Sequence, residues 1–211
     1  MICISIGNES MIREVNALKP SLVEIRYDLL RREPAMVAGE LDSAILQVAT
    51  CRPGIYPEEE RMQILKDAVV NGALYVDIEI ESSADYLAEI GSIAKEKKVH
   101  LIISYHNYKE TPSSEELKEI LATCYEKGAD VAKIACQVND RDDNARLLSL
   151  YSEQGRKVVI GMGQIGRVTR YAAIDLGAEF SFASIADDAS TAPGQLTYQQ
   201  FQSIQKTLRN A

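Results

Sequence analysis

A regular alternation of short β-branched runs with longer amphipathic stretches constrains the fold of this chain more than any other feature. The short runs have the length and composition of buried strands, and the stretches between them carry apolar residues at helical spacing. This alternation is typical of a parallel sheet whose strands are joined by crossover helices. The predicted strands are residues 2–6, 22–27, 44–50, 74–80, 99–105, 130–135, 157–162 and 179–184. The predicted helices are residues 9–18, 34–41, 58–71, 84–96, 113–127, 141–154, 165–176 and 197–209.

Eight strand-then-helix units in 211 residues predict a single-domain (β/α)8 TIM barrel, an α/β fold that spans residues 1–211. The chain is near the lower end of the size range of that fold, so it leaves little room for a second domain. An open doubly wound sheet is the structural alternative. We favour it less because the first strand is not followed by the glycine-rich turn that is typical of dinucleotide-binding sheets.

The charge and the cysteines exclude several classes of function. A formal net charge of -8 argues against binding to nucleic acid or to an anionic membrane, because both need a basic surface. An anionic substrate would therefore need a local cluster of arginines. The four cysteines form no CxxC pair and no zinc-like spacing with histidine, which predicts a reduced, cytoplasmic protein with no metal site. No apolar stretch approaches the ~20 residues of a membrane span.

The second predicted strand has an unusual distribution of charge. Val23 and Ile25 share one face, while Glu24, Arg26 and Asp28 share the other. An edge strand with a solvated face would explain an isolated pattern of this kind. In a barrel, however, the apolar face must contact the helices, so the charged face would point to the interior. Interior charges persist only when they pair with each other or with a ligand, and this favours a polar substrate.

One histidine and one lysine stand on neighbouring predicted strands. His106 ends the fifth strand, and Lys133 lies among small apolar residues in the sixth. Taken singly, the histidine could be structural, and most lysines near strand ends extend to water. The neighbours of Lys133 would instead keep its side chain inside the barrel, and burial favours the neutral amine that attacks carbonyl groups. Together the two residues predict Schiff-base chemistry with acid–base transfer next to a carbonyl.

Other polar residues at strand ends carry weaker signals. Arg52 follows the third strand, where its guanidinium would suit a carboxylate or vicinal hydroxyls, although an isolated arginine there is usually a surface residue. Asp77 and Glu79 share one face of the fourth strand, where they would orient catalytic groups or balance buried cations. The glycine-containing turn at residues 161–167 could bind an anion at a helix start, but such turns are common.

These fragments together resemble the type I 3-dehydroquinate dehydratases, the Schiff-base enzymes of the shikimate pathway. The resemblance begins at Cys3-Ile4-Ser5 and covers nearly the full chain, with every fragment in order and at suitable spacing. The other fragments are Glu24-Ile25-Arg26-Tyr27-Asp28, Thr50-Cys51-Arg52, Asp77-Ile78-Glu79, Ser104-Tyr105-His106, Ala132-Lys133-Ile134-Ala135, Met162-Gly163 with Arg167, and Ala192-Pro193-Gly194-Gln195.

The resemblance implies a (β/α)8 enzyme that converts 3-dehydroquinate to 3-dehydroshikimate and water by syn elimination. It implies that Lys133 forms the Schiff base, that His106 is the general base and acid, and that Arg167 holds the substrate carboxylate. It also implies a stand-alone homodimer that needs no cofactor. The residues expected to contact the substrate hydroxyls and ring are Ser5, Glu24, Arg26, Arg52, Thr191 and Gln195.

The chain departs from the family pattern in two places. The family often has a Glu-Gly-Gly segment after the arginine of the third strand, and its glutamate orients the histidine. Here the segment contains Glu58, Glu59 and Glu60 instead, and we expect Glu58 to take that part. Thr191 stands where the family frequently has serine, which retains a hydroxyl, and the preceding loop carries Asp187 and Asp188, to which we assign no role.

Two alternatives to the dehydratase remain open at this stage. A class I Schiff-base aldolase acting on a sugar phosphate would need a dedicated phosphate site, for which the turn at residues 161–166 is the candidate. A catalytically idle binding barrel would keep the architecture without the chemistry. The presence of both His106 and Lys133 argues against that second alternative, because an idle site has no need of the pair.

Overall fold

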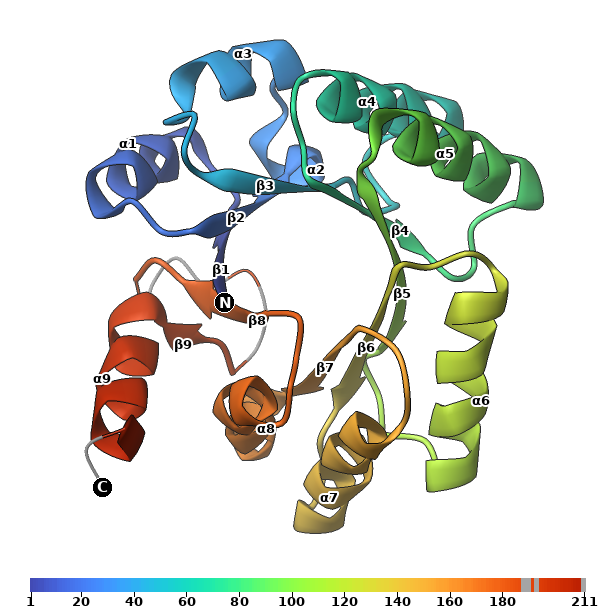
Figure 1. Ribbon diagram of the computed structural model, residues 1–211, viewed down its shortest axis with the longest axis vertical. Coiled ribbons are helices and arrows are strands. Elements are labelled where there is room, and N and C mark those ends of the chain that lie inside the picture. The colour runs from blue at the N-terminus through green and yellow to red at the C-terminus, as the bar shows by residue number, and fades with distance from the viewer. Residues whose placement is uncertain (187–190, 192–193, 210–211) are drawn as a thin grey trace.

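A curled parallel sheet with helices on its outer face forms the molecule (Figure 1). The computed structural model describes residues 1–186, 191 and 194–209. Within these residues nine strands form one sheet in the order β7-β6-β5-β4-β3-β2-β1-β8-β9, and every neighbouring pair is parallel. A backbone hydrogen bond of 3.0 Å from the Glu179 amide to the Lys157 carbonyl joins the starts of β8 and β7. The predicted TIM barrel is therefore confirmed.

The observed elements follow the predicted ones closely. The strands are β1 (Ile2–Ile6), β2 (Leu22–Arg26), β3 (Leu46–Thr50), β4 (Tyr75–Glu79), β5 (His100–Asn107), β6 (Val131–Gln137), β7 (Lys157–Met162), β8 (Ser181–Ser184) and β9 (Leu196–Thr197). The helices are α1 (Glu9–Leu18), α2 (Tyr27–Leu30), α3 (Pro34–Glu40), α4 (Glu58–Val70), α5 (Ala84–Lys97), α6 (Ser114–Glu126), α7 (Arg141–Ser149), the 3-10 turn η1 (Leu150–Ser152), α8 (Gly163–Asp175) and α9 (Tyr198–Arg209). None of these described helices is both long and apolar enough to cross a membrane.

Two short elements were not predicted. Helix α2 begins at Tyr27, so β2 ends at Arg26 and Asp28 is not a strand residue. Strand β9 contains Thr197, which also caps α9, because its hydroxyl accepts the Gln200 amide at 3.2 Å while the Gln200 side chain accepts the Thr197 amide at 3.0 Å. Elements of two and four residues carry too few positions for a periodic sequence pattern to reveal them.

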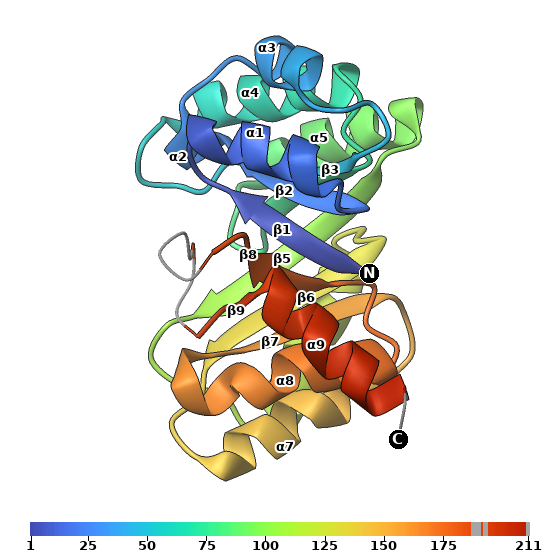
Figure 2. The same cartoon turned by 90° about the vertical axis from the view of Figure 1, so that its left-hand side faces the viewer.

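The sheet separates two packing layers. Val23 and Ile25 point outward and are fully buried against the helices, as the pattern of β2 predicted. Inward residues at the start of the strands, among them Leu22, Val48 and Ile102, form an apolar floor inside the barrel. Nearer the carboxyl ends the inward residues include polar ones, such as Glu24 and Lys133, beside apolar ones such as Met162. The strand arrowheads β1, β5 and β6 in Figure 2 point to the same side of the molecule, where those carboxyl ends meet. The fold thus gathers polar side chains at one end of the barrel.

Candidate active site

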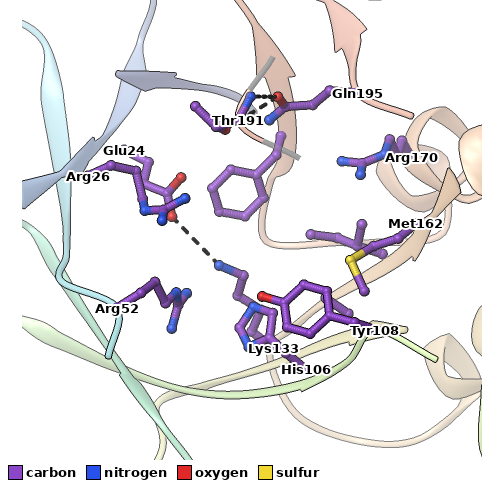
Figure 3. Close-up of a pocket in the computed structure, with 13 residues that line it drawn as sticks. Glu24, Arg26, Arg52, His106, Tyr108, Lys133, Met162, Arg170, Thr191 and Gln195 are labelled. Atoms are coloured by element: carbon purple, nitrogen blue, oxygen red, sulfur yellow. Dashed lines mark hydrogen bonds and ion pairs between the residues drawn. The ribbon is translucent and has the colours of Figure 1, made fainter. Parts of the chain in front are cut away.

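A cavity opens at the carboxyl ends of the strands (Figure 3). Its wall combines charged groups with an apolar side that includes Phe182 and Met162. Such a mixture suits a small polar molecule with a carbon skeleton. The residues that line it are Glu24, Arg26, Arg52, His106, Tyr108, Lys133, Ala135, Ile160, Met162, Arg170, Phe182, Thr191 and Gln195.

Lys133 extends from β6 into the interior of the barrel, and only 4% of the residue is exposed. Its Nζ donates a hydrogen bond of 2.8 Å to Asp77 Oδ2 and lies 3.7 Å from Glu24 Oε1. It also lies 4.4 Å from the centre of the Phe182 ring, a cation–π distance. The lysine therefore does not extend to water, as its apolar neighbours in the sequence predicted. Carboxylates and an aromatic face compensate for its burial.

Arg52 follows β3 and connects the carboxylates of β4. One terminal nitrogen donates to Asp77 Oδ1 at 3.0 Å and to Glu79 Oε1 at 2.7 Å, and the other donates to Asp77 Oδ2 at 2.7 Å. The Ser104 hydroxyl adds a hydrogen bond of 2.6 Å to Asp77 Oδ1. Arg52 lines the cavity, but its terminal nitrogens already donate within the protein. The alternative that Asp77 and Glu79 balance buried cations thus describes the observed contacts.

The ionisation of Asp77 follows from these contacts. Burial alone would raise the pKa of this carboxyl, since the residue is only 1% exposed. The positive charges of Arg52 and Lys133 outweigh burial and hold the Asp77 pKa well below its usual range. For Arg52, burial opposes the charged form, but Asp77 and Glu79 raise its pKa above the ordinary arginine value. Asp77 and Arg52 are therefore ionised at neutral pH.

His106 lies on β5 next to Lys133 in Figure 3, and its ring stacks on Tyr108 with centroids 6.0 Å apart and planes 14° apart. Burial, reinforced by the positive charges of Arg52 and Lys133, lowers the pKa of the His106 imidazole well below its ordinary value, while Asp77 opposes the shift. The imidazole is therefore neutral at neutral pH and able to accept a proton. Tyr108 was not singled out from the sequence.

A second chain of polar contacts links β1, β2 and the segment after β8. The Ser5 hydroxyl donates to Glu24 Oε2 at 2.7 Å, and the Thr50 hydroxyl donates to Glu24 Oε1 at 3.0 Å. The Gln195 amide nitrogen donates to Ser5 Oγ at 3.4 Å, and the Gln195 oxygen accepts the Thr191 amide at 2.9 Å. Of the predicted residues in this chain, Glu24, Thr191 and Gln195 line the cavity, whereas Ser5 lies behind them and is 1% exposed.

Arg26 completes the charged side of the cavity. Its Nε donates to Asp28 Oδ1 at 2.9 Å and its terminal nitrogen donates to Asp28 Oδ2 at 2.6 Å, so the two residues form a bidentate ion pair. Pairing of the charges with each other, one of the two arrangements that the pattern of β2 left open, is thus present, although Asp28 belongs to α2. Burial opposes the charge of Arg26, but Asp28 and Glu24 raise its pKa.

Arg167 and Arg170 both lie on α8, but only Arg170 lines the cavity. Arg170 is 1% exposed, and in Figure 3 it points into the cavity from α8. Burial and then the charge of Arg167 lower its pKa to about 10, which still leaves it a cation at neutral pH.

The helical period explains why Arg170 faces inward. The buried residues of α8 are Gly166, Thr169, Arg170 and Ala173, which occupy one helix face at spacings of three and four. Arg167 is displaced from that face. This signal was present in the sequence, since small residues stand four before and three after Arg170. Sequence reasoning selected Arg167 and missed Arg170.

The glycines of the β7–α8 turn have a packing explanation. A Cβ on Gly166 would lie 2.5 Å from the Gly161 carbonyl carbon, so both glycines allow α8 to cross β7 closely. The Gly161 amide donates to the Thr169 hydroxyl at 2.7 Å and is therefore not available to an anion. Packing accounts for these glycines without a phosphate ligand, and this weakens the aldolase alternative.

Three other expectations concern Glu58, the two aspartates before Thr191 and metal binding. Glu58 is exposed, accepts a 2.5 Å hydrogen bond from the Ser83 hydroxyl, and is not among the described residues that line the cavity. Asp187 and Asp188 lie outside the described residues. In the part of the chain that the structure describes, no three histidine, cysteine or carboxylate side chains are grouped so that they could hold a metal ion.

Several known proteins similar to this chain in both sequence and fold belong to one enzyme family. The model of the type I 3-dehydroquinase family matches residues 2–211. A 3-dehydroquinate dehydratase of Methanococcus maripaludis is 34% identical over 220 residues, covering 97% of this chain and 98% of the relative. One of Methanocaldococcus jannaschii is 32% identical and covers 93% of each chain. The crystal structure of the 3-dehydroquinate dehydratase of Aquifex aeolicus superposes with a TM-score of 0.87 at 26% identity, covering 100% of both chains. The chain belongs to the type I 3-dehydroquinase family of hydro-lyases.

Proposed function

We propose that the protein dehydrates 3-dehydroquinate to 3-dehydroshikimate through a Schiff base on Lys133. The observation that carries the proposal is the buried Lys133 ammonium at the floor of a cavity that also holds the neutral imidazole of His106. A lysine amine and an imidazole are sufficient for removing a proton next to a ketone. The family to which the chain belongs adds the identity of the substrate.

The reaction proceeds in four balanced steps. The Lys133 amine attacks the C3 ketone of the substrate, and loss of water with uptake of one proton from solvent gives a protonated imine. His106 accepts the proton at C2, and the C–H electron pair moves into the imine, which becomes a neutral enamine. The imidazolium returns that proton to the C1 hydroxyl, which leaves as water while the enamine electrons form the C1–C2 double bond. Hydrolysis of the conjugated iminium releases 3-dehydroshikimate, the free amine and the proton taken up in the first step.

The substrate carboxylate pairs with Arg170 in this proposal. The side chain is a buried cation that lines the cavity, and its guanidinium has the geometry to bind a carboxylate through two hydrogen bonds. Arg167, expected from the resemblance to take this role, acts instead on Arg170 through its charge. The substrate hydroxyls and ring contact Glu24, Arg26, Thr191 and Gln195, while Ser5 orients Glu24 and Arg52 orients Asp77.

Four further parts of the proposal follow from family membership and composition. Residues 1–211 form one catalytic domain, the reaction serves the shikimate pathway, the enzyme acts as a homodimer without a cofactor, and it works in the cytoplasm. Analytical ultracentrifugation tests the dimer directly. A monomer at assay concentration would contradict that part of the proposal.

Borohydride trapping tests the function. The protein is incubated with 3-dehydroquinate, reduced, and digested, and peptide mass spectrometry locates the adduct. We expect a reduced adduct on Lys133 and none in the Lys133→Ala variant. A folded protein that gives no adduct with 3-dehydroquinate but gives one with a phosphorylated ketose would refute the dehydratase in favour of the aldolase. Binding of 3-dehydroquinate without turnover or adduct would favour the idle barrel.

A further inference from the structure

Arg61, on the outer helix α4, is a buried cation that none of the proposed catalytic steps uses. The residue is 5% exposed, and its guanidinium lies 5.4 Å from the centre of the Tyr86 ring. Its Nε donates a 2.8 Å hydrogen bond to the carbonyl of Cys51, and a terminal nitrogen donates to Glu79 Oε2. Burying an arginine is costly unless its partners are fixed, so these contacts indicate a defined position.

A continuous chain of ion pairs connects this helix to the reactive lysine. Arg61 binds Oε2 of Glu79, and Arg52 binds Oε1 of the same carboxylate at 2.7 Å. Arg52 also holds both oxygens of Asp77, at 3.0 and 2.7 Å. Asp77 in turn accepts the Lys133 ammonium at 2.8 Å. Glu79 and Asp77 are both buried, so solvent screens this chain little.

The charges of this cluster balance. Arg61, Arg52 and Lys133 supply the positive charges, and Asp77, Glu79 and Glu24 supply the negative ones. The other titratable or charged groups that influence Asp77 and Lys133 are His106 on β5, Cys3 on β1 and Arg26, which is paired with Asp28. Removal of one member therefore leaves one unit of uncompensated charge near Lys133.

We propose that Arg61 is a positioning residue for the reaction at Lys133. Through Glu79 and Arg52 it sets how strongly Asp77 binds the lysine ammonium. The inference rests on the proposed role of Lys133 as the nucleophile. Without Arg61, Glu79 draws Arg52 away from Asp77, and Asp77 binds the ammonium more firmly. The excess negative charge acts in the same direction. The nucleophilic amine then becomes available only at higher pH.

Reductive methylation of Lys133 tests this coupling without the natural substrate. The protein is treated with formaldehyde and dimethylamine-borane over a pH series, and mass spectrometry measures methylation of the Lys133 peptide. In Arg61→Met the pH of half-maximal reaction should rise by about one unit, the size expected for one charge at roughly 10 Å through an effective dielectric constant of about 20. Glu79→Gln should lower it, and the double variant should return close to the wild-type value.

Two further variants separate the proposed role from simple structural damage. Arg61→Lys keeps the charge and should keep the wild-type midpoint, even if loss of the Cys51 contact lowers the melting temperature. Arg156→Met removes the same charge from a pair with Glu179 at the opposite end of the barrel and should leave the midpoint unchanged. Opposite shifts in the Arg61→Met and Glu79→Gln variants would not arise from destabilisation alone.

The outcomes distinguish this inference from the proposed function. A wild-type midpoint in both Arg61→Met and Glu79→Gln, or shifts of the same sign, would overturn the coupling even if 3-dehydroquinate is trapped on Lys133. The predicted opposite shifts, in a protein that forms no adduct with 3-dehydroquinate, would support the coupling and refute the dehydratase. If Arg61→Met fails to fold, Glu79→Gln alone still decides, because an unchanged midpoint there also overturns the coupling.

Discussion

Arg170→Met should weaken substrate binding far more than Arg167→Met, although both variants lose one positive charge from the same helix. A guanidinium and a carboxylate form two charge-assisted hydrogen bonds in the bidentate geometry. At about 1.5 kcal/mol net for each bond, their loss amounts to about 3 kcal/mol, or roughly a 100-fold increase in KM. The same interaction exists before and during the chemical step, so kcat should change little.

The structure also predicts the stability of the variants. Arg170 is a buried cation whose pKa is lowered to about 10, which means that burial of its charge opposes folding at neutral pH. Methionine has a similar length, is neutral, and packs well in irregular spaces. The melting temperature of Arg170→Met should therefore stay near that of the wild type, so that a change in KM reports on binding and not on unfolding.

Steady-state kinetics with 3-dehydroquinate provide the measurement, by following the absorbance of the conjugated product. Arg167→Met is the matched control, and its KM should stay within a factor of about 3, because Arg167 does not line the cavity. The KM of Arg170→Lys should lie between those of Arg167→Met and Arg170→Met, since lysine keeps the charge but cannot form the bidentate pair of a guanidinium. An unchanged KM in Arg170→Met, or an equal increase in Arg167→Met, would refute the assignment of the carboxylate to Arg170.

Three other predictions follow from the same site. His106→Ala should lower kcat by about 10² to 10⁴ while a trapped adduct still forms slowly, and wild-type turnover in this variant would contradict the acid–base role. Lys133→Ala should fold, as judged by circular dichroism, but form no adduct; a surviving adduct would move the nucleophile to another residue. The pKa of Asp77 is below its usual range, so its contribution to stability is present above the unfolded value of about 3.9 and is lost as the pH falls towards the lower folded value. Urea unfolding over an acidic pH series should therefore show a shallower loss of stability in Asp77→Asn, and an identical pH dependence would argue against the lowered pKa.

The sequence predicted those features that depend on local periodicity. Alternation along a pleated strand is enforced by geometry, so Glu24 could be assigned to the interior once Val23 and Ile25 were assigned to the helices. The same reasoning applied to Lys133, whose apolar neighbours left its side chain no route to water. Charged residues at such positions identify a site because an apolar core gives no reason to keep them.

Features that depend on helix orientation or distant contacts were harder to predict. Arg170 and Arg167 are separated by less than one helical turn, and only the face defined by Gly166 and Ala173 distinguishes them. The contact of Arg61 with Glu79 joins residues 18 apart in sequence, on different elements. No local pattern encodes such a pair, because it depends on how α4 packs over β4. Glu58 illustrates the opposite case. Its position in the sequence suggested that it orients His106, but its side chain is exposed and bonds to Ser83.

The carboxylates around Lys133 have opposite effects on successive steps of the proposed reaction. Asp77 at 2.8 Å and Glu24 at 3.7 Å bind the Lys133 nitrogen, which must leave these contacts before it attacks the ketone. The protonated imine that follows carries a positive charge at the same nitrogen, so the same carboxylates stabilise it. A site with fewer carboxylates would react sooner but hold the imine less well. On this reasoning Asp77→Asn should form the trapped adduct faster than the wild type at the same pH but accumulate less of it at saturation. Greater accumulation in the variant would show that the carboxylate does not stabilise the imine.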